Sequence, residues 1–182
     1  MASQDLKKIT TTLKSQSLSL TDPHTSQLLR TAKRHLLSLN ALTPFTITDP
    51  TILTLARETY EQGALSSIRA KDSDSFTRYV AQLSPFYELP SDNLDIPQRN
   101  KITGLYLLLL LTQGLYDKFH SELEVLTTRE GTNVDIETDT YLGYPIRLER
   151  WLMEGSYDRV WKAMKKGEVP CEEYSVFSDV CT

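Results

Sequence analysis

Few side chains in this sequence have the type and spacing that catalysis requires. His120 and Glu124 are four residues apart, so on a helix they would share one face and could offer two ligands to a metal ion. No further ligand follows at a suitable spacing, and we favour an exposed polar pair. The other two histidines, His24 and His35, are far from this pair in the sequence. The sequence therefore predicts no metal site.

Two groups of carboxylates are the other candidates for proton transfer. Asp135, Glu137 and Asp139 form one group, and Glu122 and Glu124 form the other. A general acid–base pair needs two carboxyl groups in different environments, whereas closely spaced surface acids are usually solvated, and we favour a solvated face. The sequence also lacks a nucleophile elbow, a phosphate-binding loop and a dinucleotide-binding glycine motif. We predict no enzyme activity, no small-molecule substrate and no cofactor.

Basic residues gather at Arg30, Lys33 and Arg34, with Lys14 as a more distant neighbour. On one helix the three side chains would form a modest contact patch for nucleic acid or for an acidic protein. Nucleic acid is disfavoured as a partner, because 20 basic and 24 acidic residues give the chain a net charge of −4. We retain the patch as a candidate contact surface.

A repeated phrase indicates how the chain positions its side chains. Gln113–Phe119 reads Gln-Gly-Leu-Tyr-Asp-Lys-Phe, and 41 residues later Glu154–Val160 reads Glu-Gly-Ser-Tyr-Asp-Arg-Val. Each copy predicts a turn between two helices, in which glycine ends the first helix with a positive φ. We expect the tyrosine to pack into the turn and the aspartate to lie near the next helix N-terminus. The turn residues are Gly114, Tyr116, Asp117, Gly155, Tyr157 and Asp158.

A third, weaker copy extends the pattern. The apolar spacing that follows the first phrase, at i, i+4 and i+7 from Phe119, recurs 43 residues earlier at Phe76, Val80 and Leu83. A helix–turn–helix unit repeated about every 40 residues is typical of an α-helical array. No segment shows the convincing period-2 alternation of a strand. The predicted fold class is therefore all-α, a right-handed array of helix–turn–helix pairs.

Helix starts and breaks follow from capping residues and prolines. Asp22-Pro23 and Asp49-Pro50 predict two helix starts, and the second helix is expected to run to about Ala70. The polar, cap-rich stretch Lys71–Asp74 predicts a turn and a further helix start. Pro85 predicts a kink or an end near Ser84. Further expectations are loops at Leu89–Pro97 and Thr127–Thr132, a helix opened by Pro145, and a last short helix opened by Val169-Pro170 with Tyr174 and Phe177. The aromatic side chains expected to pack in the core near the turns are Tyr116, Trp151, Tyr157 and Trp161.

Length and composition limit the remaining classes. The chain has 182 residues, enough for one domain or one array of several helix pairs. Its longest apolar run, Leu105–Leu111, is far below the roughly 20 residues that span a bilayer, and the polar N-terminus lacks the apolar centre of a signal peptide. Cys171 and Cys181 are predicted to be free thiols. We expect no membrane association and a location in the cytoplasm and nucleus.

Four stretches of the sequence resemble a known family. They are Ser67–Asp72, Phe76–Leu83, Phe119–Glu124 and Leu148–Tyr157, and the last contains the most specific residues. The family is the one shared by non-ATPase regulatory subunit 8 of the 26S proteasome, a signalosome subunit and the k subunit of translation initiation factor 3. The resemblance covers roughly Leu53–Phe177. It implies TPR- or HEAT-like helical repeats of the PCI type, which in the family lead into a winged helix.

The resemblance also implies a function. It indicates a non-catalytic scaffold of the proteasome regulatory-particle lid, which acts in lid assembly and ubiquitin-dependent protein degradation through contacts with other lid subunits. The initiation-factor subunit, the signalosome subunit and an RNA-binding PCI protein are the alternatives.

The resemblance sets the expected domain organisation too. We expect one helical repeat domain over residues 1–182, with N-terminal helices in 1–50 and PCI-type repeats in 51–182. No segment before Thr182 suits the family's winged helix, which indicates either a truncated chain or a divergent short member of the family, and we favour truncation. Pro85 departs from the matching family helix, which is expected to lack an obvious proline there.

Overall fold

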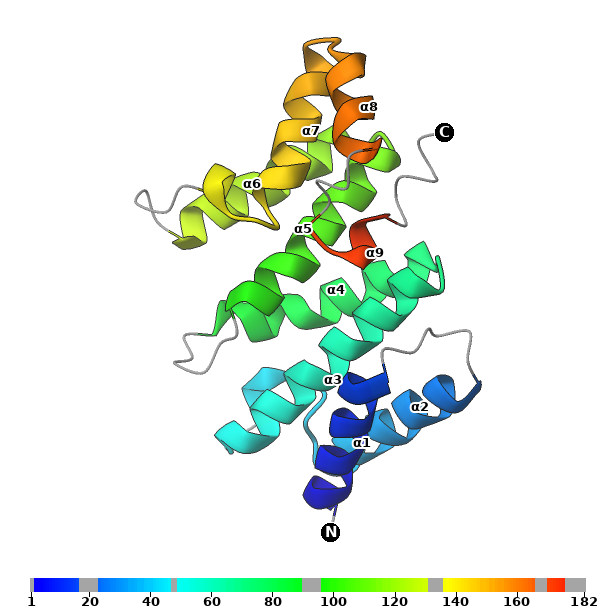
Figure 1. Ribbon diagram of the computed structural model, residues 1–182. Helices are drawn as coiled ribbons and strands as arrows, with labels where there is room; N and C mark the ends of the chain where they lie inside the picture. The colour runs from blue at the N-terminus through cyan, green and yellow to red at the C-terminus, as the bar shows by residue number, and fades with distance from the viewer. Residues whose placement is uncertain are drawn as a thin grey trace. The chain divides into compact units, whose positions relative to one another are not determined.

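Every regular element that the structure describes is a helix (Figure 1). The computed structural model describes residues 2–16, 23–46, 49–89, 96–130, 136–165 and 170–175. Its helices confirm the predicted all-α class and agree with PCI-type helical repeats. The chain divides into two compact units, Met1–Asp95 and Ile96–Thr182. The expected single repeat domain over residues 1–182 stays a prediction.

Unit 1 is built on the pairing of two long helices. Its described elements are α1 (Ala2–Gln16), α2 (Pro23–Ser38), the 3-10 helix η1 (Pro44–Thr46), α3 (Pro50–Arg69) and α4 (Ser73–Glu88). Helices α3 and α4 pack along each other, while α1 contacts both α2 and α3. Close packing of α3 on α4 requires a glycine, because a Cβ at Gly63 would lie 2.5 Å from the Tyr79 ring.

Capping residues start two of these helices as the sequence predicts. The backbone N–H of Thr51 donates to Asp49 Oδ1 at 2.9 Å, and Pro50 follows as the first helical residue of α3. The backbone N–H of Ser75 donates to Asp72 Oδ1 at 3.0 Å at the start of α4. Hydrogen bonds from Thr51 and from Ser75 lower the pKa of Asp49 and Asp72, respectively, below the ordinary value.

Helix α3 buries polar side chains as well as apolar ones, and its two buried charged side chains form an ion pair. The Arg57 side chain lies 3.5 Å from Glu61 Oε1, one turn later on the same helix. The hydroxyl of Tyr87 on α4 donates to the same Glu61 oxygen at 3.2 Å. A buried charge is tolerated when it is paired and hydrogen-bonded, so this group ties α3 to α4 without an isolated charge.

Unit 2 is arranged around its most apolar helix. Its described elements are α5 (Ile96–Thr112), α6 (Tyr116–Glu130), the 3-10 helix η2 (Ile136–Thr138), α7 (Gly143–Met153), α8 (Tyr157–Lys165) and α9 (Glu172–Ser175). Helix α5 contacts α6, α7 and α9, and α7 contacts α8 and η2. All five residues of 107–111 are buried. A helix that is apolar on all sides needs neighbours on all sides, which explains its central place in the unit.

Four helices end in the same backbone turn. The second residue after each of these helices has a positive φ, at Asn40 (53°), Lys71 (58°), Gly114 (69°) and Gly155 (70°). In each turn this residue donates its N–H to the carbonyl three residues earlier, and the next residue donates to the carbonyl five residues earlier. These two bonds define the Schellman motif, which satisfies carbonyls that the helix end leaves unpaired. The turns at residues 71, 114 and 155 have the spacing predicted for the three copies.

Two predicted helix ends are wrong. Helix α4 continues through Pro85 to Glu88, so it does not end near Ser84, although a proline inside a helix costs roughly 3 kcal/mol. The alternative, a kink near Ser84, stays a prediction. The next residues, Phe86 and Tyr87, are both buried, and burying a large apolar side chain contributes about 1.5–3 kcal/mol. Helix α6 runs to Glu130, so residues 127–130 of the predicted loop Thr127–Thr132 are helical, and the other two lie outside the described residues. Buried Leu126 holds this part of the helix in the core.

The remaining boundary predictions have mixed outcomes. The helix expected at Pro145 already begins at Gly143, because Asp139 accepts hydrogen bonds from the backbone of Tyr141 and Leu142 and prepares the turn. The last helix, α9, begins at Glu172. The predicted loop at Leu89–Pro97 lies largely outside the described residues, as do Phe177 and Cys181.

Helix α9 is too short to be stable alone and is held by α5. The Tyr174 side chain is buried, and its hydroxyl lies 3.1 Å from the Tyr141 carbonyl oxygen and 3.3 Å from that of Lys101. A Cβ at Gly104 would lie 2.1 Å from the same hydroxyl, so a glycine is required there. Glu173 adds an ion pair with Lys101 Nζ at 3.0 Å.

The ion pair predicts acid sensitivity of unit 2. Burial alone would raise the pKa of Glu173, but hydrogen bonds from Lys101 and Cys171 and the charge of Lys101 lower it to about 2. A lowered carboxylate pKa stabilises the fold above the ordinary value near 4.5, and this contribution is lost as the pH falls towards about 2. Glu173→Gln should therefore lower the free energy of unfolding near neutral pH. In urea titrations the difference from the wild type should shrink in acid; a constant difference would contradict the assignment.

The Schellman turns predict opposite effects of two substitutions. Gly114→Ala should lower the free energy of unfolding by about 1–2 kcal/mol, because an added Cβ meets no atom within 4 Å and the cost is the left-handed backbone alone. Lys71→Gly should raise it by about 0.5 kcal/mol, since relief of the same strain exceeds the entropy that glycine adds to the unfolded chain. Chemical denaturation measures both changes, and a destabilising Lys71→Gly would refute the account.

Candidate protein-interaction surface

Three large apolar side chains are exposed around the turn between α7 and α8. Met153 is 59% exposed, Tyr157 is 61% exposed and Trp161 is 42% exposed. The three residues follow one another at intervals of four, from the last residue of α7 to the middle of α8. We call this set the elbow stripe. Side chains of this size usually lie in a core, so their exposure marks a candidate contact surface.

The shape of α8 explains why the stripe is exposed. At 100° per residue the apolar side chains of α8, from Ala163 round to Trp161, occupy an arc of about 160°. Ala163 is buried and Val160 is half-buried, and α8 packs mainly on α7. One neighbouring helix covers a narrower arc than this, so Tyr157 and Trp161 remain in solvent. The prediction that Tyr157 packs into the turn is therefore wrong.

The turn between α5 and α6 has a smaller version of the same feature. Leu115 and Tyr116 are both exposed there, so the expected core packing of Tyr116 is wrong. The same holds for Trp161, because it is exposed on α8, while Trp151 is half-buried. Asp117 lies in the first turn of α6, where a carboxylate stabilises a helix N-terminus. Asp158 occupies the matching place in the first turn of α8.

The composition of the elbow stripe favours a protein as its partner. Tyr and Trp are enriched among residues that dominate binding energy at protein interfaces, and Met adapts its shape to a partner. Gly155 fixes the path of the chain between Met153 and Tyr157 through its positive φ and the Ser156 N–H to Trp151 carbonyl bond of 2.8 Å. The turn thus holds the side chains on a defined scaffold. The spacing of the three apolar residues in the sequence was the available signal for this surface.

The residues considered for catalysis have structural roles. His120 Nε2 lies 3.4 Å from Glu149 Oε1 on α7, so this histidine bridges α6 and α7. Glu137 pairs with Arg150, and Asp139 accepts a 3.0 Å hydrogen bond from the Asn100 amide. Asp135 lies outside the described residues. Within the part of the chain that the structure describes, no three His, Cys, Asp or Glu side chains form a group that could hold a metal ion.

The described cysteine is a poor nucleophile. Cys171 is a free, half-buried thiol. Burial and the neighbouring Glu173 raise the pKa of Cys171 to about 11, so the thiol is protonated near neutral pH. Because the thiolate is the reactive form, the environment of Cys171 suits a structural residue.

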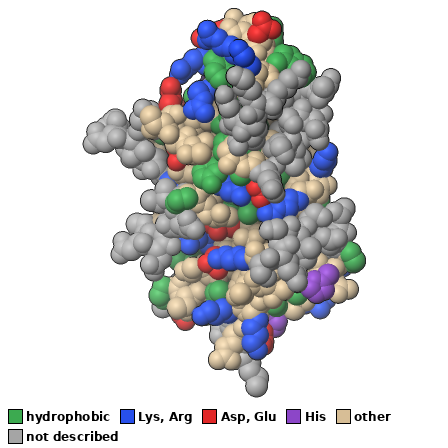
Figure 2. Space-filling view, in the orientation of Figure 1, with side chains coloured by type: hydrophobic (Ala, Val, Ile, Leu, Met, Phe, Trp, Pro, Cys, Tyr) green, Lys and Arg blue, Asp and Glu red, His purple; other side chains and the backbone are tan. Residues whose placement is uncertain are grey.

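The predicted basic patch is divided by the fold. Arg30 and Arg34 are exposed on α2, but Lys33 is half-buried, with its Nζ 4.3 Å from the centre of the Tyr79 ring. Lys14 forms an ion pair with Glu58 at 2.8 Å and is not available to the patch. On the face of the molecule in Figure 2, Lys and Arg side chains are interspersed with Asp and Glu. This distribution does not suit a phosphate backbone.

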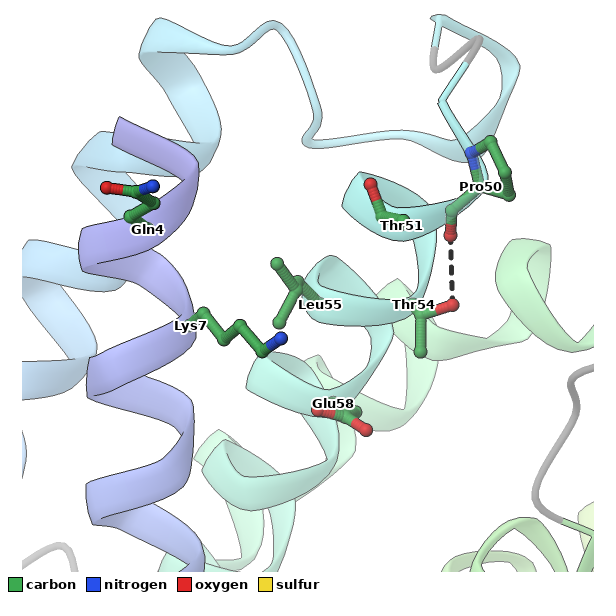
Figure 3. A pocket seen from close by; sticks show the side chains of 7 residues that line it. All are labelled: Gln4, Lys7, Pro50, Thr51, Thr54, Leu55 and Glu58. Atoms are coloured by element: carbon green, nitrogen blue, oxygen red, sulfur yellow. Dashed lines mark hydrogen bonds between the residues drawn. The ribbon is translucent and has the colours of Figure 1, made fainter. Parts of the chain in front are cut away.

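A groove of about 530 Å³ lies between α1 and α3 in unit 1 (Figure 3). Lys7 from α1 and Leu55 and Glu58 from α3 face one another across it. The Thr54 hydroxyl on its rim donates to the Pro50 carbonyl at 2.9 Å (Figure 3). The full lining is Gln4, Lys7, Pro50, Thr51, Thr54, Leu55 and Glu58. This set includes neither histidine nor cysteine, and it has no arrangement that suggests catalysis.

The fold and the elbow stripe together define a class, a helical-repeat protein whose exposed side chains suit protein contacts. Comparison with known proteins shows which family the chain resembles. Residues 97–178 match the model of the CSN8/PSMD8/EIF3K family. The chain is 40% identical over 129 residues to the 26S proteasome regulatory subunit RPN12 of Saccharomyces cerevisiae, an alignment that covers 70% of this chain and 46% of the relative.

A second relative agrees with the first. The chain is 35% identical over 159 residues to the 26S proteasome non-ATPase regulatory subunit 8 homolog A of Arabidopsis thaliana, which covers 85% of this chain and 57% of the relative. The predicted family resemblance is thereby confirmed. These relatives are named as regulatory subunits of the proteasome, and the chain spans about half of their length. Within the described residues, no helix has the length and apolarity needed to cross a membrane.

The exposure of Tyr157 predicts that its truncation leaves the fold intact. Tyr157→Ala should change the free energy of unfolding by less than about 0.5 kcal/mol, the range of surface substitutions. Phe119→Ala is the matched control in the other repeat, because Phe119 is fully buried and its loss should cost about 3–5 kcal/mol. Urea denaturation of the two variants measures both effects. Equal losses would show that Tyr157 belongs to the core.

Proposed function

We propose that the chain is a non-catalytic scaffold subunit of the 26S proteasome regulatory-particle lid. In this proposal it acts in lid assembly, and so in ubiquitin-dependent protein degradation, through contacts with other lid subunits. The observation that carries the proposal is the 40% identity to a proteasome regulatory subunit across 70% of the chain. The subunit would act in the cytoplasm and nucleus.

The elbow stripe supports the scaffold role. A scaffold needs exposed side chains that gain free energy when a partner covers them, and the elbow stripe offers a methionine, a tyrosine and a tryptophan. The two Schellman turns of unit 2 hold such side chains on short, hydrogen-bonded connections. The binding surface therefore loses little conformational freedom when it meets a partner, which favours affinity.

The family model leaves two related alternatives, since it also bears the names of a signalosome subunit and an initiation-factor subunit. The named relatives with the reported identities favour the proteasome. An RNA-binding PCI protein is a third alternative. Lys33 lies over the Tyr79 ring and not in one exposed patch with Arg30 and Arg34, which weighs against RNA binding.

The test is affinity purification of the tagged chain, with its native C-terminal continuation if there is one, from cells of its source. Proteasome lid subunits should co-purify with the wild type. Tyr157→Ser combined with Trp161→Ser should reduce their recovery about tenfold or more, the scale of two interface residues of this type. Val125→Ser is the matched control, because Val125 is also an exposed apolar residue of unit 2 but lies on α6, outside the elbow stripe.

The outcomes separate the parts of the proposal. Recovery of initiation-factor or signalosome subunits in place of lid subunits would assign the chain to a sister complex. Recovery of lid subunits by the double variant at the wild-type level would keep the scaffold role and exclude the elbow stripe as the contact. Binding to none of the three complexes would refute the scaffold role.

A further inference from the structure

The exposed face of α2 combines positive charge with an apolar end. Arg30, Arg34 and Leu37 are spaced at i, i+4 and i+7, so they share one side of the helix. Arg30 and Arg34 are exposed, and Leu37 is 62% exposed. The opposite side holds the buried residues Thr25, Leu29, Ala32 and Leu36. The three exposed side chains therefore form one continuous strip, which we call the α2 strip.

The charge of α2 is unbalanced along its length. The helix Pro23–Ser38 contains no Asp or Glu. Lys33 adds a third positive charge beside the α2 strip, where its ammonium group lies over the Tyr79 ring. Arg30 and Arg34 form no ion pair with a residue that the structure describes. An arginine pair one turn apart offers two planar groups that can each receive a carboxylate.

The segment that follows α2 extends the apolar end. Phe45 is 77% exposed in η1, and Leu42 between α2 and η1 is also exposed. This segment has a fixed anchor, because Ala41 is fully buried and the Tyr60 hydroxyl on α3 donates to the Leu42 carbonyl at 3.3 Å. The apolar side chains thus project from backbone that is held to the unit. A basic strip that ends in exposed Leu and Phe matches a ligand with both carboxylates and apolar side chains.

We infer that the α2 strip, together with Leu42 and Phe45, binds an acidic protein segment that carries large apolar side chains. Complementary charge would set the orientation of the segment, and the apolar contacts would add affinity. The surface fits RNA less well. Single-stranded nucleic acid is held by a longer basic track and by several aromatic side chains, whereas the described part of this face offers two exposed guanidinium groups and one phenyl ring. The α2 strip belongs to unit 1, and its binding of an acidic segment does not depend on the proposed function.

The experiment measures binding of labelled probes to the full chain by fluorescence anisotropy. The probes are a synthetic peptide with Glu at its polar positions and Leu or Phe at every fourth position, the same peptide with each Glu replaced by Gln, and a single-stranded oligouridine. The Glu peptide should bind at least about tenfold more tightly than the other two, and its affinity should fall as salt rises, since screening weakens exposed charge pairs.

Three double variants locate the site. Arg30→Glu with Arg34→Glu should weaken binding of the Glu peptide about tenfold or more, because two attractions become repulsions. Leu37→Ser with Phe45→Ser should weaken it several-fold and leave its salt dependence unchanged. Lys7→Glu with Lys8→Glu is the matched control, with the same change of charge on exposed residues of α1, and should stay within about twofold. Far-UV circular dichroism should show unchanged helix content in all three.

Several results would overturn the inference. Equal affinity for the Glu and Gln peptides would remove the role of charge. An equal loss in the α1 control would mean that binding follows net charge and not the α2 strip. Tighter binding of the oligouridine than of the Glu peptide would assign this face to RNA. Absence of measurable binding of the Glu peptide to the wild type would refute the docking surface itself.

Discussion

Each of four helix ends in the described chain depends on one residue whose backbone is left-handed. At each of these ends, two carbonyls of the last helical turn accept hydrogen bonds from backbone N–H groups that follow the helix. The left-handed residue then changes the direction of the chain. Three of these turns join the members of a helix pair, at residues 71, 114 and 155. The repeat of the sequence is therefore a repeat of this turn, and the packing of α3 on α4, of α5 on α6 and of α7 on α8 follows from it.

The same turns connect the fold to its candidate function. A Schellman turn is short, so the side chains beside it cannot all point into the pair of helices that it joins. At the α7–α8 turn the side chains left exposed are apolar, and they form the elbow stripe. At the α3–α4 turn the corresponding residues are the polar Arg69, Ser73 and Thr77. Helical arrays use their exposed surfaces for binding, and here the local sequence at each turn sets the chemistry that such a surface offers.

The sequence predicted the candidate site only in part. It located both glycine turns and the aspartates that follow them, because these features depend on a few neighbouring residues. It placed Tyr116, Tyr157 and Trp161 in the core, and the structure places them in solvent. It grouped Lys33 with Arg30 and Arg34, whereas Lys33 lies over a ring from another helix. The exposure of Leu37 and Phe45 was not predicted, since a single apolar residue has no sequence pattern that shows whether it is exposed.

What the sequence determined by itself was the set of helices, the caps at Asp49 and Asp72 and the spacing of the turns, together with the family. These depend on backbone hydrogen bonds and apolar periods that span a few residues. Tertiary structure alone decided that α4 continues through Pro85, that Gly63 faces the ring of Tyr79 and Gly104 the hydroxyl of Tyr174, and which side of α8 is uncovered. The reason is that burial depends on how much of a helix its neighbours cover, and those neighbours come from distant parts of the chain.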